Sequence, residues 1–206
     1  MEHEFWHNKW QENRIGFHQE SIHTFLTNHW NSLYPKDRQT VLVPLCGKSL
    51  DMIWLAKQGF HVIGVELSEL AAQQFFSENK LEHTIAESDK FKVYKGIEIE
   101  IWVGNVFEMK PIKNVCAVYD RAALVALPLE MRNDYIKKII EITPHAPHLL
   151  IVFEYDQNIL PGPPFSISEE YISTNYTSFS VNLIEQRSID LKGVCTAQEN
   201  CYILSK

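Results

Sequence analysis

The chain has 206 residues, of which 45% are hydrophobic and 22% are charged. This length and composition favour one globular domain with a large core and exclude a mainly disordered chain. The formal net charge of -7 argues against a nucleic-acid partner, because affinity for phosphates depends on clustered Lys and Arg side chains.

Nothing in the sequence indicates secretion, membrane insertion or metal binding. The first residues lack the basic and apolar regions of a signal peptide, and no apolar run reaches the roughly 18 residues that span a bilayer. The four cysteines show no CxxC or zinc-ligand spacing, and the N-terminal histidines lack Cys or carboxylate companions. We therefore expect a cytoplasmic, monomeric protein with reduced thiols and no metal.

The predicted elements begin with two helices, around residues 5–10 and over 22–33, the second ended by Pro35 and Asp37. Buried strands and amphipathic helices then alternate, which predicts an α/β fold with a largely parallel sheet covered on both faces. In chain order, the predicted elements are strand 40–45, helix 49–56, strand 61–66, helix 70–79, a hairpin over 91–105 about Gly96, strand 115–120, helix 129–142, strand 149–155, helix 168–175 and strand runs 178–187 and 201–204. We expect the last two runs to form an antiparallel edge hairpin.

Ligands of open α/β sheets bind beyond the carboxyl ends of the strands. The turn at Gly47, after the first strand, lacks the GxxxxGK[ST] spacing of a P-loop and the GxGxxG spacing of a dinucleotide-binding site. The missing GxGxxG disfavours NAD and FAD as cofactors. The alternative is that this segment is a strand-to-helix turn with no ligand. Glu66 ends the second strand, about 20 residues after Gly47. An acidic side chain at this position accepts hydrogen bonds from the hydroxyl groups of a ribose. A ribose site without a pyrophosphate site favours a nucleoside cofactor such as S-adenosylmethionine.

Three more positions are candidates on chemical grounds. Asn105 and Val106 follow the third strand tip and could face an adenine. Arg121 ends the fourth buried strand, where a cation in a cleft needs an anionic partner; a salt bridge to Asp120 or Glu130 is the alternative. Trp10 is a core residue on base rates, although a sulfonium cation also favours an aromatic face.

The sequence resembles the thiopurine S-methyltransferase family in its bacterial form. The matching segments are Trp6-His-Asn-Lys-Trp10, Gly16-Phe-His-Gln, Val43-Pro-Leu-Cys-Gly-Lys-Ser49, Val62-Ile-Gly-Val-Glu-Leu-Ser68, Tyr119-Asp-Arg-Ala-Ala-Leu-Val-Ala126 and Pro161-Gly-Pro-Pro-Phe165. The resemblance implies a Rossmann-like class I methyltransferase with a mostly parallel seven-stranded sheet and an antiparallel C-terminal edge strand. It also implies a single domain over 1–206, in which residues 1–35 cover the cleft. Residues 82–95 match no motif.

The resemblance also implies roles for individual residues. The positions expected to bind S-adenosylmethionine are Trp10, Leu45, Gly47, Glu66, Asn105, Val106 and Arg121. Phe17, Arg121 and Pro163 are expected on the side of a small-molecule thiol. The implied reaction is attack of a thiolate on the sulfonium methyl, which leaves S-adenosylhomocysteine. Arg121 would orient the thiolate, and no dedicated general base is needed.

Other functions remain open at this point. The nearest alternative is a detoxifying methyltransferase for selenium or tellurium species or small inorganic thiols. A nucleotide-dependent oxidoreductase, a nucleoside-binding module without catalysis and a nucleic-acid methyltransferase are more distant. The absence of GxGxxG and of an (N/D)PP(Y/F) tetrapeptide counts against the first and the last of these.

Overall fold

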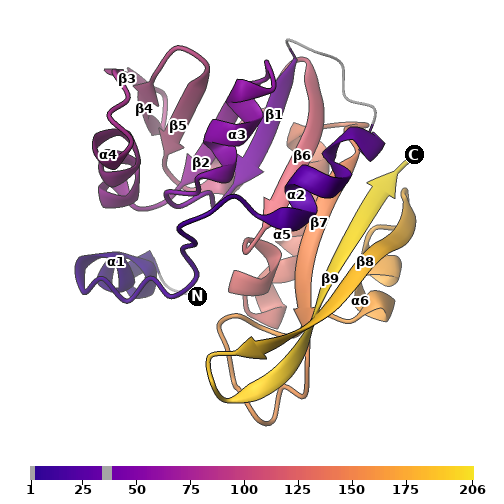
Figure 1. Ribbon diagram of the computed structural model, residues 1–206. Helices are drawn as coiled ribbons and strands as arrows, with labels where there is room; N and C mark the ends of the chain where they lie inside the picture. Colours follow the sequence, from indigo (N-terminus) through magenta and orange to yellow (C-terminus); the bar gives the residue numbers. More distant parts are fainter. Residues whose placement is uncertain (1–2, 34–38) are drawn as a thin grey trace.

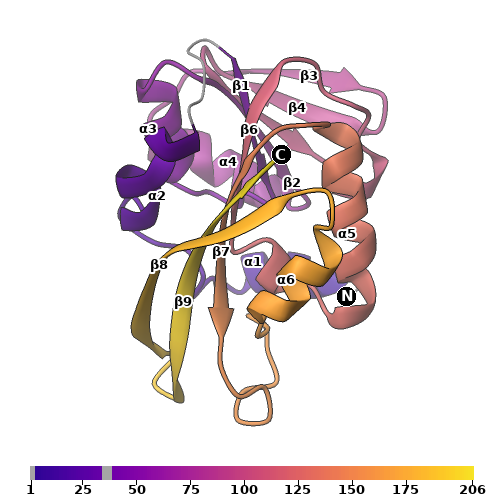
Figure 2. The same cartoon turned by 90° about the vertical axis from the view of Figure 1, so that its right-hand side faces the viewer.

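The computed structural model describes residues 3–33 and 39–206. The predicted helix end at Pro35 and Asp37 lies outside the described residues. Within them, the predicted alternation of strands and helices is confirmed, and the elements fold into a single continuous sheet with helices on both faces (Figures 1 and 2).

The sheet has nine strands in the order β3-β4-β5-β2-β1-β6-β7-β9-β8. Their bounds are β1 Thr40–Pro44, β2 His61–Glu66, β3 Thr84–Ser88, β4 Phe91–Lys95, β5 Ile99–Val103, β6 Val115–Arg121, β7 His148–Glu154, β8 Ser180–Leu191 and β9 Cys195–Ser205. The five central strands, from β5 to β7, pair in parallel, and both edges are antiparallel. The predicted mostly parallel centre and antiparallel C-terminal edge are therefore confirmed.

The expected strand number of seven is wrong, because β3 and β4 extend the sheet beyond β5. The hairpin about Gly96 is confirmed as the pair β4 and β5. Strand β3 falls in the segment 82–95 that matched no motif, and its residues from Thr84 to Glu87 are exposed. Backbone pairing with β4 holds this strand in the sheet, so the apolar alternation that marks a half-buried strand is missing.

Helices cover both faces of the sheet (Figure 2). The helical elements are α1 His3–Gln11, α2 Thr24–His29, η1 Trp30–Leu33, α3 Asp51–Lys57, α4 Glu69–Glu78, η2 Val106–Glu108, η3 Leu124–Ala126, α5 Leu129–Ile142 and α6 Glu169–Asn175. The helix predicted over 22–33 is divided into α2 and a 3-10 turn. The helix predicted over 49–56 begins at Asp51, and the Ser49 Oγ accepts the Asp51 N–H at 3.2 Å.

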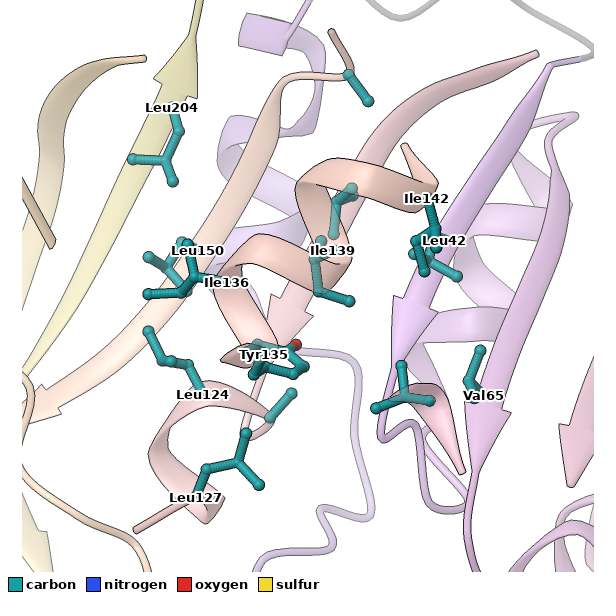
Figure 3. Close-up of a cluster of buried hydrophobic side chains, with 14 of the residues drawn as sticks. Leu42, Val65, Leu124, Leu127, Tyr135, Ile136, Ile139, Ile142, Leu150 and Leu204 are labelled. Atoms are coloured by element: carbon teal, nitrogen blue, oxygen red, sulfur yellow. The ribbon is translucent and has the colours of Figure 1, made fainter. Parts of the chain in front are cut away.

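Each central strand contributes alternate side chains to two buried clusters, as a strand covered on both faces does. Leu150 and Val152 pack with α5 on one face, whereas Leu149 and Ile151 pack with α2 and α3 on the other. Figure 3 shows the first cluster, in which Tyr135, Ile136, Ile139 and Ile142 line one side of α5. This one-sided apolar spacing explains why the helix is predicted correctly from sequence.

The topology brings several strand ends together at one edge of the sheet. Strand order reverses between β1 and β6, which is the switch point where ligands of such sheets bind. In Figure 1, α1 lies beyond the arrowheads of β1 and β2, and the turn joining β8 to β9 extends toward the same end. In the described part of the chain, no helix has both the length and the apolar character needed to cross a membrane.

Candidate active site

A cavity of about 550 Å³ opens at the carboxyl ends of the central strands. Segments from the whole chain form its wall, including α1, the loops after β1, β2, β5 and β6, the Pro-rich loop and the β8–β9 hairpin. It brings together every residue predicted for the site: Trp10, Phe17, Leu45, Gly47, Glu66, Asn105, Val106, Arg121 and Pro163.

The turn after β1 has a backbone geometry that L-residues adopt reluctantly. Leu45 has φ +48° and Gly47 has φ +53°. Left-handed geometry costs a residue with a Cβ about 1–2 kcal/mol, and such strain concentrates at functional sites. The Cys46 N–H donates to the Val65 carbonyl at 3.0 Å, which fixes this turn against β2. The turn is therefore held in a conformation that exposes its backbone to the cavity.

Glu66 is the acidic residue of the cavity that the sequence placed at the end of β2. Its two carboxylate oxygens accept the backbone N–H groups of Gly47 and Ser68, each at 2.8 Å. Burial raises the pKa of this carboxyl, and the backbone donors oppose that rise. Each carboxylate oxygen can accept a second hydrogen bond, so Glu66 can receive hydroxyl groups of a ligand while it holds the turn.

Aromatic rings from the N-terminal segment pack directly against the Gly47 turn. The Trp10 and Phe17 rings meet edge to face with centroids 5.6 Å apart, and the Trp6 ring lies 5.7 Å from the Phe17 ring. A Cβ on Gly47 would stand 3.2 Å from Cζ2 of Trp10. Trp10 is 4% exposed and also lines the cavity, so it is at once a core residue and part of the wall.

Arg121 enters the cavity from the end of β6, and no carboxylate of residues 3–33 or 39–206 pairs with it. One Nη donates to the Phe17 carbonyl at 3.2 Å, and the buried Nε has no hydrogen-bond partner among the same residues. The alternative of a salt bridge to Asp120 or Glu130 is wrong, since neither residue pairs with Arg121 in the described structure. The next residue, Ala122, has φ +64°, a second strained position at this edge.

The Asp120 carboxylate instead anchors the loop that follows Arg121. It accepts the Tyr135 hydroxyl at 2.6 Å and the Leu124 N–H at 3.2 Å. Burial raises the pKa of Asp120 to about 6. Asp120 therefore fixes the backbone from which Arg121 projects, while the Arg121 guanidinium keeps its hydrogen-bonding capacity for a ligand.

The third strand tip is tied to the second through the backbone. The Gly104 N–H donates to the Glu66 carbonyl at 2.8 Å. The Asn105 side chain accepts the Phe107 N–H at 3.1 Å and so begins the short helix η2, which carries Val106. Asn105 and Val106 thus reach the cavity beside Glu66, as expected of residues that follow a neighbouring strand.

The cavity residues contributed by the β8–β9 hairpin were not predicted from the sequence. Glu199 is 2% exposed and pairs with Arg187, at 2.5 Å, and with the His23 ring, at 3.0 Å. Lys192 lies at the turn of the hairpin. They reach the cavity because β9 pairs antiparallel with β7, a tertiary arrangement that leaves no local pattern in the sequence. Glu199 lies in the polar run Gln198-Glu199-Asn200, before the strand run predicted from the sequence, so no local signal marks it as a buried cavity residue.

Comparison with known proteins identifies the family. The family model for thiopurine S-methyltransferase matches residues 1–206. The thiopurine S-methyltransferase of Teredinibacter turnerae is 43% identical over 100% of this chain and 98% of that protein. The chain belongs to the thiopurine S-methyltransferase family.

Other thiopurine S-methyltransferases match over similar lengths. That of Psychrobacter cryohalolentis is 41% identical over the whole of both chains. Among solved structures, 1,6-didemethyltoxoflavin-N1-methyltransferase of Burkholderia thailandensis, with bound S-adenosylhomocysteine, covers 99% of this chain and 87% of its own with a TM-score of 0.68. Sequence identity to that protein is 13%, so the likeness supports the methyltransferase fold alone.

Proposed function

We propose that this chain transfers the methyl group of S-adenosylmethionine to the sulfur of thiopurines or related aromatic and heterocyclic thiols. Its family membership and fold support this reaction. The observation that carries the proposal is the placement of Glu66 and Arg121 in one cavity, at the ends of the two strands that flank β1. Glu66 can accept hydrogen bonds from a ribose, and Arg121, which pairs with no carboxylate in the described part of the chain, can bind an anionic acceptor.

The cavity fits S-adenosylmethionine on three observations. Its volume of about 550 Å³ lies within the range of small-molecule sites. The absence of a Cβ at Gly47 lets the Trp10 and Phe17 rings pack against the turn, and these rings form an aromatic part of the cavity wall that suits a sulfonium cation. Glu66 is held by two backbone donors with hydroxyl-binding capacity to spare. We assign Glu66 to the ribose, Asn105 and Val106 to the adenine side, and Trp10 with Leu45 to the rest of the cofactor.

When bound, the cofactor would supply a methyl group on a positively charged sulfur. This sulfur is the leaving group when a nucleophile attacks the methyl carbon in line. The protein would contribute positioning of the acceptor and exclusion of water. Phe17 and Pro163 would contact the acceptor ring, and Arg121 would favour its thiolate. An acidic heterocyclic thiol is largely ionised near neutral pH, so no residue is required to remove its proton.

Several features of the protein in solution belong to the same proposal. We propose that the chain is a single domain whose predicted N-terminal segment, 1–35, covers the cleft; its described part, residues 3–33, contains α1, α2 and η1. We also expect a cytoplasmic monomer that does not bind nucleic acid. A role in detoxification is compatible with thiol methylation. The comparisons favour the thiopurine reaction over methylation of selenium or tellurium species.

Methyl transfer from labelled S-adenosylmethionine tests the proposal directly. The purified protein is incubated with 6-mercaptopurine, with an aliphatic thiol and with selenite in parallel. We expect label in S-methylated mercaptopurine and much slower transfer to the other two. Faster transfer to selenite than to the thiopurine would overturn the proposed acceptor class.

A further inference from the structure

Two lysines that the proposed reaction does not use line the cavity where α1 and the β8–β9 hairpin contribute to its wall. Lys9 lies on α1 and Lys192 lies at the turn between β8 and β9, so they come from opposite ends of the chain. Both line the cavity, and neither forms an ion pair with a carboxylate within residues 3–33 and 39–206. We refer to Lys9 and Lys192 as the lysine pair.

The lysine pair differs from the other cations of the wall that lie outside the reaction site. Those cations are neutralised by neighbouring carboxylates: Lys48 by Glu78 at 2.7 Å, Arg187 by Glu199 at 2.5 Å, and Arg14 by Glu12. The Asp190 carboxylate also lines this end and accepts the Gly193 N–H at 3.0 Å, and no ion pair joins it to either lysine within the described residues. Within the described residues, the lysine pair therefore has no carboxylate in direct contact, and its ammonium groups can still pair with an anionic ligand.

The position of Lys192 places this charge beside the acceptor. Its ammonium donates to the Pro163 carbonyl at 2.6 Å, on the Pro-rich loop assigned to the acceptor side. An ammonium has three donors, so two remain for a ligand. The Lys9 ammonium lies over the Phe5 ring, 5.4 Å from its centroid. Burial and the charge of Lys9 both lower the pKa of Lys192, as expected for two cations held near each other.

We propose that the lysine pair binds a carboxylate of the acceptor, so that the protein prefers aromatic thiols that carry a second negative group away from the sulfur. This inference rests on the proposed methyl transfer to thiols. A bound carboxylate would relieve the repulsion between the two ammonium groups and form charge-assisted hydrogen bonds. The methionine carboxylate of the cofactor has the same chemistry, so the experiment must separate the two sources.

The test compares two ligands that differ by one carboxylate, 4-mercaptobenzoate and thiophenol. Calorimetry measures the affinity of each for the protein saturated with S-adenosylhomocysteine. We expect the wild-type protein to favour 4-mercaptobenzoate by about tenfold or more, and Lys192→Met or Lys9→Met to reduce that preference about tenfold. Lys192→Arg should keep it. Lys57→Met removes an exposed charge at the far end of α3, outside the cavity, and should leave the preference unchanged.

Three outcomes decide between the possibilities. Equal wild-type affinity for the two thiols overturns the inference. An undiminished preference for 4-mercaptobenzoate in both Met variants also overturns the inference. If these variants weaken only the binding of S-adenosylhomocysteine, the lysine pair binds the cofactor carboxylate instead. If 4-mercaptobenzoate binds preferentially through the lysine pair but neither thiol is methylated, the carboxylate site stands and the proposed methyl transfer fails.

Discussion

The backbone of Gly47 lies against the Trp10 ring so closely that a Cβ would stand 3.2 Å from Cζ2. Gly47 also has φ +53° and donates its N–H to Glu66. This contact joins the N-terminal helix, the strained turn after β1 and the carboxylate at the end of β2. The conformation of the turn and the position of the aromatic wall therefore depend on the same residue.

Gly47→Ala tests this contact. We expect the affinity for S-adenosylmethionine to fall about tenfold or more, because the methyl group displaces Trp10, and stability to fall by about 1–2 kcal/mol from backbone strain. Gly59→Ala is the matched control, since Gly59 has φ +90° but a Cβ added there would meet no atom within 4 Å. It should lower stability without weakening cofactor binding. Similar cofactor loss in both variants would show that strain alone is responsible.

Glu66→Gln tests the ribose assignment. Charge-assisted hydrogen bonds contribute roughly 1.5–3 kcal/mol, so calorimetry should show an affinity for S-adenosylmethionine about ten- to a hundredfold lower. Glu100→Gln is the control, because Glu100 is another buried sheet carboxylate, paired with Lys95 at 2.8 Å and outside the cavity. Glu100→Gln should lower the melting temperature and leave the affinity for S-adenosylmethionine unchanged. An unaltered affinity in Glu66→Gln would remove the residue from the cofactor site.

Arg121→Met should separate function from stability. Because Arg121 has no acidic partner among the described residues, its removal leaves no buried anion unpaired. We expect Tm to shift by about 3 °C or less, while kcat for a thiopurine falls about a hundredfold.

Arg132→Met provides the opposite pattern. The Arg132 Nε donates to the Leu127 carbonyl at 2.9 Å, and its guanidinium packs over Phe165 and Tyr171. Thermal melts should show a larger loss of stability than for Arg121→Met, with a smaller loss of kcat. A destabilised Arg121→Met protein of full specific activity would assign Arg121 to the fold.

His148 makes stability depend on pH. It is fully buried beside Tyr176 and Phe179, and neither ring nitrogen has a hydrogen-bond partner among the described residues. Burial lowers the pKa of His148 to about 3. Between about pH 6.5 and the folded-state pKa, the unfolded chain binds a proton at this position and the folded chain does not. The His148 contribution therefore disfavours folding as pH falls, by about 1.4 kcal/mol per unit.

His148→Leu isolates this effect from the opposing one at Asp120. Burial raises the Asp120 pKa to about 6, so this group favours the folded state as pH falls from about 6 to about 4. We would measure the free energy of unfolding in urea at several pH values. Between about pH 6 and pH 4, the stability of the variant relative to the wild type should rise by about 1.4 kcal/mol for each unit by which the pH falls. A constant difference over that range would mean that His148 titrates normally in the folded protein.

The sequence predicted the parts of this molecule that have a local signal. The helix over 129–142 shows the spacing of Tyr135, Ile136, Ile139 and Ile142, and its bounds are confirmed. Six of the candidate site residues end or directly follow parallel strands, and parallel strands bring such ends together: Leu45, Gly47, Glu66, Asn105, Val106 and Arg121. Their convergence on one cavity therefore followed once the strands were placed, whereas their individual roles rest on the resemblance.

The parts that could not be predicted depend on tertiary contacts. Strand β3 is exposed and held by backbone pairing, so no side-chain period marks it. Lys192 reaches the cavity through the long β8–β9 hairpin, whose register the sequence does not show. Leu45 and Ala122 have positive φ without the glycine that usually marks such positions. Packing around these residues stabilises backbone conformations that their own side chains disfavour.

A crystal structure with S-adenosylhomocysteine and 6-mercaptopurine would examine the assigned cofactor and acceptor positions together. We predict that the ribose hydroxyls contact Glu66 and that the mercaptopurine lies between Phe17 and Pro163, with its sulfur near Arg121. A cofactor bound in this cavity with its ribose away from Glu66, or a mercaptopurine that does not approach Arg121, would contradict these assignments.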